Sequence, residues 1–186
     1  MCSDGDKPLV QEWETAMGIF IALLRGINVG GTGLLPMKDL TGLCSGLGFL
    51  AVRTYIQSGN VIFESRLSEE DIRSSLEKAV ARRVGKNVDV MVRTPAEMRS
   101  ILDNNPFPDK EPARVAVAFL CEPPPKNLMM NVVAPGAEQV KPGKREVYVY
   151  YPDGMGRSKL KLPLNGAAAT VRNINTVAKL VALTER

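Results

Sequence analysis

The sequence predicts an α+β fold made of two parts of unequal size. Three features of residues 17–93 predict the first part: a continuous apolar run at 19–24, two stretches with apolar residues at helical spacing, and a β-rich hairpin between those stretches. With a further strand at 88–92 the order is βαββαβ, which is the ferredoxin-like pattern. We therefore expect a four-stranded antiparallel sheet with both helices on one face.

Each element of this first part has its own local signal. The apolar run ends at Arg25, and the glycine-rich residues 26–33 must then form a loop. Pro36 fits the first position of a helix, and Gly48 closes that helix. Ser58-Gly59 is the two-residue turn of the hairpin.

The second part, residues 94–186, is expected to be a smaller α+β unit that packs with the first. Its pattern predicts strands at 114–120 and 146–151, and a last helix that begins at residues 170–173. Residues 1–16 are polar and aperiodic, so we expect a flexible N-terminal extension there.

The composition excludes several classes of chemistry. The chain has 186 residues, of which 45% are hydrophobic and none is histidine. Without histidine there is no Ser-His-Asp or Cys-His catalysis, no zinc site that uses imidazole and no imidazole pH switch. We predict no metal and no cofactor, and no catalytic group stands out.

The cysteines and the apolar runs indicate where the protein resides. Three cysteines without CxxC spacing are typical of reduced, intracellular thiols. The longest apolar stretches are far too short for a membrane span, and the acidic start does not resemble an export signal. We expect a cytoplasmic protein without a membrane partner.

The charge is concentrated near the C-terminus. The whole chain carries a formal net charge of +4, and residues 141–186 hold nine Lys and Arg against three Asp and Glu. A positive segment of this kind suits an anionic partner, such as nucleic acid or a phosphorylated ligand. A solvated basic surface without a partner is the alternative.

One candidate site lies where the loop after the first strand meets the hairpin, since both are at the same end of a βαββαβ sheet. Its polar and flexible residues are Arg25, Asn28, Gly30, Gly31, Gln57, Ser58 and Asn60. Backbone N–H groups, a helix N-terminus and an arginine together suit an anion. The alternative is that the glycines and amides only stabilise turns. The glycine spacing does not match a dinucleotide or P-loop fingerprint.

A second candidate site combines Arg157, Ser158 and Lys159 with Arg172 and Asn173. A cation at the start of a helix opposes the helix dipole, so Arg172 in that place calls for a reason. An anion held by the helix and by Arg172 would provide it. The alternative is an ion pair between Arg172 and a nearby carboxylate.

Several motifs resemble one known family. The resemblance is carried by residues 22–31 (ALLRGINVGG), 53–63 (RTYIQSGNVIF), 105–107, 151–160 and 170–180. These blocks resemble the family catalogued as domain of unknown function 1697, from about Met17 to the C-terminus. The resemblance implies a soluble, mostly bacterial α+β protein and supplies no activity. Ile174 stands where the family usually has Trp, which favours a packing role at that position.

These observations lead to one main hypothesis and two alternatives. The main hypothesis is a non-catalytic binding protein for a phosphate-bearing ligand, either nucleic acid or a nucleotide. Arg25 with the Gly30-Gly31 backbone would hold one anion, and Arg157, Lys159 and Arg172 would hold others. The alternatives are an enzyme that acts on a small anionic metabolite, and a protein-interaction module with a basic docking face. The sequence does not indicate an oligomeric state.

Overall fold

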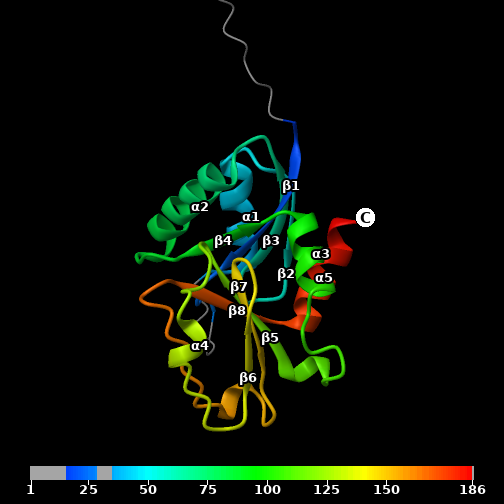
Figure 1. The fold of residues 1–186 in the computed structure, drawn as a ribbon. Helices are drawn as coiled ribbons and strands as arrows, with labels where there is room; N and C mark the ends of the chain where they lie inside the picture. Colours follow the sequence, from blue (N-terminus) through cyan, green and yellow to red (C-terminus); the bar gives the residue numbers. More distant parts are fainter. Residues whose placement is uncertain (1–15, 29–34, 186) are drawn as a thin grey trace, which may run out of the picture.

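A computed structural model describes residues 16–28 and 35–185. Within them the chain forms two four-stranded antiparallel sheets and five α-helices (Figure 1). The predicted extension, apart from Ala16, and the glycines Gly30 and Gly31 lie outside the described residues.

The first sheet has the predicted βαββαβ order. Its strands and helices are β1 (Gly18–Leu24), α1 (Met37–Gly46), β2 (Leu50–Tyr55), β3 (Asn60–Ser65), α2 (Glu69–Val84) and β4 (Val90–Arg93). The strand order is β2-β3-β1-β4, and all neighbouring strands are antiparallel. This confirms the predicted arrangement, in which β3 lies between β1 and β2.

Alternation along β1 gives the first sheet two buried faces. Ala22 and Leu24 face a core cluster that includes Leu40 of α1 and Leu76 of α2. Both helices therefore cover the same face, as predicted. The alternate residues of β1 face the opposite side, toward two helices of the second part, α3 (Pro95–Asp103) and α5 (Ile174–Thr184).

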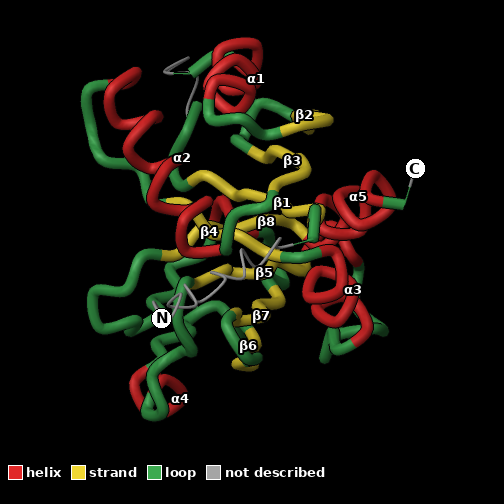
Figure 2. The backbone as a smooth tube through the Cα atoms, turned by 90° about the horizontal axis from the view of Figure 1, so that it is seen from above, coloured by secondary structure: helices red, strands yellow, loops and turns green. Residues whose placement is uncertain are grey.

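The second part adds a second antiparallel sheet. Its elements are α3 (Pro95–Asp103), β5 (Val115–Leu120), α4 (Leu128–Asn131), β6 (Gln139–Pro142), β7 (Glu146–Tyr150), β8 (Ala169–Asn173) and α5 (Ile174–Thr184), with short 3-10 turns at Pro112–Arg114 and Met155–Arg157. The strand order is β6-β7-β5-β8. Helices α3 and α5 pack on residues of both sheets, and Figure 2 shows them on one side of the molecule, with α1 and α2 across the first sheet.

The structure corrects one expectation for this second part. Residues 170–173 do not begin the last helix, because they form β8, which pairs with β5 from Ala116↔Asn173 to Leu120↔Ala169. The helix begins at Ile174, and the Asn173 side chain caps it by accepting a hydrogen bond from the backbone N–H of Asn175.

Candidate functional site

Arg172, which the sequence assigned to the second candidate site, lies instead among the residues of the first one. It lies on β8 and is 7% exposed, and its side chain reaches from the second sheet to the end of β1 and the β2–β3 hairpin. Its Nε donates to Oδ1 of Asn60 at 2.5 Å, and its Nη2 donates to the carbonyls of Leu24 and Ser58, both at 2.9 Å. Nη1 donates to Oγ1 of Thr170 at 2.7 Å and to the Val171 carbonyl at 2.9 Å.

These contacts occupy the whole donor capacity of the guanidinium. An arginine has five N–H donors, and here each has an oxygen acceptor. These acceptors are all neutral, and in the described ranges no carboxylate pairs with Arg172. Burial lowers the pKa of Arg172 to about 10. Arg172 therefore joins the two sheets, and it has no free donor for a ligand.

The other side chains of this group are also engaged within the protein. Arg25 forms an exposed ion pair with Asp89 at 2.9 Å. Asn28 exchanges hydrogen bonds with the backbone of Leu35 and donates to the carbonyl of Gln57 at 3.1 Å. Asn28 thus ties the β1 end to the hairpin, as the turn-stabilising alternative predicted for such amides.

The hairpin itself fits closely against the end of β1. Asn60 is fully buried, and its amide donates to the Tyr55 carbonyl and to Oγ of Ser58. A Cβ atom at Gly59 would lie 3.0 Å from Cβ of Leu24, and Gly59 has a φ of +76°, so both space and backbone conformation favour glycine there. The structure thus brings Asn28, Ser58 and Asn60 near Arg172, in a group whose polar atoms largely satisfy one another.

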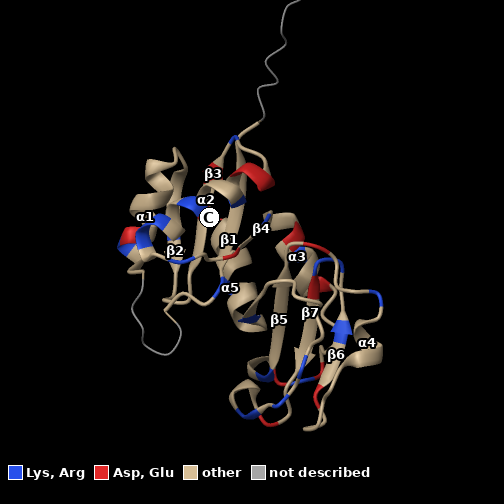
Figure 3. Cartoon of the chain, turned by 90° about the vertical axis from the view of Figure 1, so that its left-hand side faces the viewer, with Lys and Arg blue, Asp and Glu red and all other residues tan. Residues whose placement is uncertain are grey.

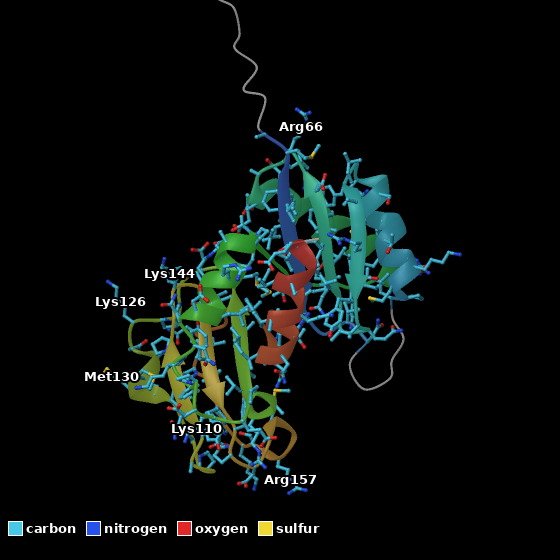
Figure 4. All side chains as sticks on the ribbon, turned by 90° about the vertical axis from the view of Figure 1, so that its right-hand side faces the viewer. Arg66, Lys110, Lys126, Met130, Lys144 and Arg157 are labelled. Atoms are coloured by element: carbon cyan, nitrogen blue, oxygen red, sulfur yellow. The ribbon has the colours of Figure 1, made fainter. Side chains whose placement is uncertain are left out.

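Arg157, Ser158 and Lys159 lie in a different place, around a cavity of about 460 Å³ beyond the C-terminal end of β7. The cavity is lined by Pro135, Gly136, Glu138, Tyr151, Pro152, Asp153, Gly154, Arg157, Ser158 and Lys159. Figure 4 shows Arg157 at the end of the molecule opposite Arg66. The candidate residues of the second group are thereby divided, because Arg172 and Asn173 line no part of this cavity.

The two basic side chains of this cavity are available to a ligand. Arg157 and Lys159 are both exposed, and neither side chain has a hydrogen bond or ion pair with the part of the chain that the structure describes. Acidic side chains also line the cavity, and Figure 3 shows basic and acidic residues mixed in the loops at this end of the second sheet. The cavity therefore offers free cationic donors beside carboxylate acceptors.

A hydrogen bond between Ser158 and Glu138 connects the two walls of the cavity. The Ser158 hydroxyl donates to Oε1 of Glu138 and accepts from the backbone N–H of Leu160 at 3.0 Å. Oε2 of Glu138 accepts from the Gly136 N–H at 2.8 Å, and a Cβ at Gly136 would lie 3.0 Å from this carboxylate. Because Gly136 has no side chain, the Glu138 carboxylate can fold back onto its own loop.

The pKa values of two side chains in the cavity are shifted in opposite directions. The hydrogen bond from Ser158, with help from the backbone, lowers the pKa of Glu138. Burial, and then the charge of Glu138, raises the pKa of Tyr151. At neutral pH the carboxylate is ionised and the phenol is protonated. This arrangement suits ligand binding better than proton transfer, which favours groups with a pKa near 7.

Sequence reasoning did not find Glu138, because its partner Ser158 is 20 positions away and nothing in the local sequence connects them. Gln57, the remaining candidate, is exposed and takes part through its backbone carbonyl. The described residues contain no group of three His, Cys, Asp or Glu side chains that could hold a metal ion.

Comparison with known proteins identifies the family. The family described as Protein of unknown function (DUF1697) matches residues 17–148. The chain belongs to this family. Its name assigns no activity. The matched segment includes the end of β1 and the β2–β3 hairpin, and it ends before Tyr151 and Arg172. The resemblance inferred from the sequence motifs is thus confirmed over residues 17–148, and the motifs at 151–160 and 170–180 lie outside the matched segment.

A solved structure supports the fold. The chain is similar to the conserved bacterial protein SP0830 from Streptococcus pneumoniae, with 24% sequence identity and a TM-score of 0.73. The similarity covers 90% of this chain and 99% of that one. The comparison with curated proteins finds no significant match. No described helix has the length and apolar character that crossing a membrane requires.

Proposed function

We propose that this protein binds a small phosphate-bearing ligand in the cavity lined by Arg157 and Lys159. The observation that carries the proposal is that these two cations border the same cavity and have no side-chain partner within the described ranges. Arginine and lysine are the usual donors to phosphate oxygens, and a charge-assisted hydrogen bond is about twice as strong as a neutral one.

Two further facts favour a small ligand over a polynucleotide. A volume of about 460 Å³ lies in the range of small-molecule pockets. Binding a nucleic acid strand needs a track of cations along its backbone, and Arg172 cannot join such a track because its donors are already used. Arg172 therefore does not share a binding surface with Arg157 and Lys159.

Calorimetric titration with AMP and with a hexose 6-phosphate tests this proposal. We expect saturable binding by the unmodified chain, and a loss of about tenfold or more in affinity in each of Arg157→Ala and Lys159→Ala, because each loses a charged hydrogen bond. Arg66→Ala and Lys126→Ala are matched controls, because both residues are exposed and lie outside the cavity, and they should bind as the unmodified chain does.

Two results would overturn the proposal. One is the absence of binding by either phosphate ester. The other is equal binding by the Arg157→Ala variant and the Arg66→Ala control. Anisotropy with a labelled single-stranded oligonucleotide is the complementary measurement. Tight, steeply salt-dependent binding there would favour nucleic acid over a small ligand.

A further inference from the structure

We infer that the cavity selects a phosphate monoester that carries hydroxyl groups, such as a sugar phosphate or a nucleoside monophosphate, over a polyphosphate. This inference rests on the proposed function, since it concerns the same cavity. It identifies the part of the ligand that the cations do not contact.

The charges that line the cavity are divided between two kinds. Arg157 and Lys159 provide two positive charges, and Glu138 and Asp153 provide two negative charges. A cavity that held a chain of phosphates would bring the second and third phosphates close to the two carboxylates. A phosphate and a carboxylate repel each other strongly when they lie close together and water is partly excluded. One phosphate beside the cations avoids that repulsion.

The carboxylates can accept hydrogen bonds from donors of a ligand. An ionised carboxylate is acceptor-only and has about four lone-pair sites. Glu138 uses two of them, for Ser158 and Gly136, and Asp153 has no side-chain partner among residues 16–28 and 35–185. Neutral hydroxyl groups supply donors without adding negative charge. The combination of free cations and free acceptors therefore matches a ligand with a phosphate at one end and hydroxyls at the other.

The size of the cavity agrees with a ligand of two parts. The space of about 460 Å³ exceeds what a phosphate group alone would fill, and its remaining wall includes Tyr151, Pro135 and Pro152. Tyr151 is 7% exposed and packs in a core cluster, so its ring is held in place beside the two prolines. A compact organic group fits beside it.

The test compares four ligands on the full chain: inorganic phosphate, a hexose 6-phosphate, AMP and ATP. For the unmodified protein we expect the two monoesters to bind about tenfold more tightly than inorganic phosphate or ATP. In Asp153→Asn we expect monoester affinity to fall several-fold and ATP affinity to rise, since the amide neither attracts hydroxyls as strongly nor repels phosphates. Asp153 is exposed and its side chain has no partner in the described part of the chain, so this variant keeps the fold. Asp103→Asn, an exposed aspartate of α3 outside the cavity, is the control.

The outcomes separate the inference from the proposed function. If all four ligands bind equally, and Arg157→Ala weakens them all, phosphate binding stands and hydroxyl selection is wrong. If Asp153→Asn leaves the ratio of AMP to ATP affinity unchanged, hydroxyl selection is also wrong. If none of the four ligands binds, the proposed function fails and the inference fails with it.

Discussion

Arg172 and Arg157 belong to the same basic segment of the sequence, but the structure uses them in opposite ways. Arg172 is 7% exposed, and all its donors meet oxygen atoms of the protein. Arg157 is exposed beside a cavity and has no side-chain partner within the described part of the chain. The difference shows that the number of acceptors around a cation decides its role. Its position in a charged segment does not.

A second arginine also bridges the two sheets, but its surroundings differ from those of Arg172. Arg93, on β4, is 1% exposed and donates to the carbonyls of Leu120 at 2.6 Å and of Arg145 at 2.9 Å. Arg145 in turn forms ion pairs with Glu69 at 2.5 Å and Glu97 at 2.6 Å. The Arg172 bridge, called here the neutral bridge, thus relies on neutral acceptors alone. The Arg93 bridge, called the ionic bridge, is supported by carboxylates through Arg145.

The largest expected effect comes from breaking the neutral bridge. Arg172→Met keeps much of the side-chain volume but leaves Oδ1 of Asn60 and the Ser58 carbonyl buried without their donor. Each orphaned acceptor costs about 1–3 kcal/mol, so the free energy of unfolding should fall by about 3 kcal/mol. Urea-induced unfolding followed by circular dichroism measures this change.

The matched comparison is Arg157→Met, which should change the free energy of unfolding by less than about 0.5 kcal/mol, because the side chain is exposed and contacts no polar partner among the described residues. Equal destabilisation by Arg172→Met and Arg157→Met would contradict the division of roles. Arg172→Lys should remain strongly destabilised, since an ammonium group cannot reproduce the planar fork of five donors.

Removing the ion pairs that support the ionic bridge should lower the free energy of unfolding by less than Arg172→Met does. Arg145→Ala deletes the ion pairs with Glu69 and Glu97, whose side chains are all partly exposed, and leaves the backbone acceptors of Arg93 in place. We expect the free energy of unfolding to fall by about 1.5 kcal/mol, and 1 M NaCl to weaken the unmodified chain more than the variant. Destabilisation as large as that of Arg172→Met would show that carboxylate support matters as much as buried neutral acceptors.

The ionic bridge also predicts a dependence on acidic pH that the neutral bridge lacks, because no carboxylate contacts Arg172 within the described residues. Burial by itself would raise the pKa of Glu97, but hydrogen bonds from Thr94 and Arg145 outweigh burial and hold the pKa below its ordinary value of 4.5. The folded state therefore binds the Glu97 proton less readily than the unfolded state. This contribution to stability is present above pH 4.5 and is lost as the pH falls through the folded-state pKa.

The measurement for this prediction is the free energy of unfolding from pH 7 to pH 3. Glu97→Gln should lose less stability across this range than the unmodified chain, while it keeps the N-terminal cap of α3 through its amide oxygen. Parallel pH profiles of the two proteins would exclude Glu97 as the source.

The first sheet was predictable from the sequence because its signals are local. The apolar run of β1 and the helix boundaries each lie within a few residues, and the order of elements then fixes the sheet. The hairpin was also predictable, but its loop has four residues, 56–59, instead of the expected two, because Tyr55 pairs with Asn60. Strand β8 was missed for the opposite reason. Residues 170–173 run directly into α5, and only the pairing with β5, more than 50 positions earlier, makes them a strand.

The candidate site shows the same limit. The sequence placed Arg172 beside a helix N-terminus and Arg157, whereas its partners Leu24, Ser58 and Asn60 lie more than 100 positions earlier in the chain. The Arg157–Lys159 segment could be proposed from charge alone. Its acceptor Glu138 could not, because the contact that brings it into the cavity depends on the path of the loop before β6.

The smallest expected effect concerns the link between the cavity walls. Ser158→Ala removes the hydroxyl that joins Glu138 to the cationic segment, while Glu138 keeps its bond to the Gly136 N–H. The free energy of unfolding should fall by less than about 1 kcal/mol, because the group is near the surface and one bond remains. Affinity for AMP should fall about threefold, since Arg157 and Lys159 are then held less firmly beside the carboxylate.

Because the Ser158 bond lowers the pKa of Glu138, that pKa should rise in the Ser158→Ala variant, and carboxyl chemical shifts followed by NMR measure it. Ser158→Thr keeps the hydroxyl and should restore both the affinity and the low pKa. A variant whose AMP affinity falls while the pKa of Glu138 stays unchanged would place the role of Ser158 in direct contact with the ligand instead of in positioning the cations.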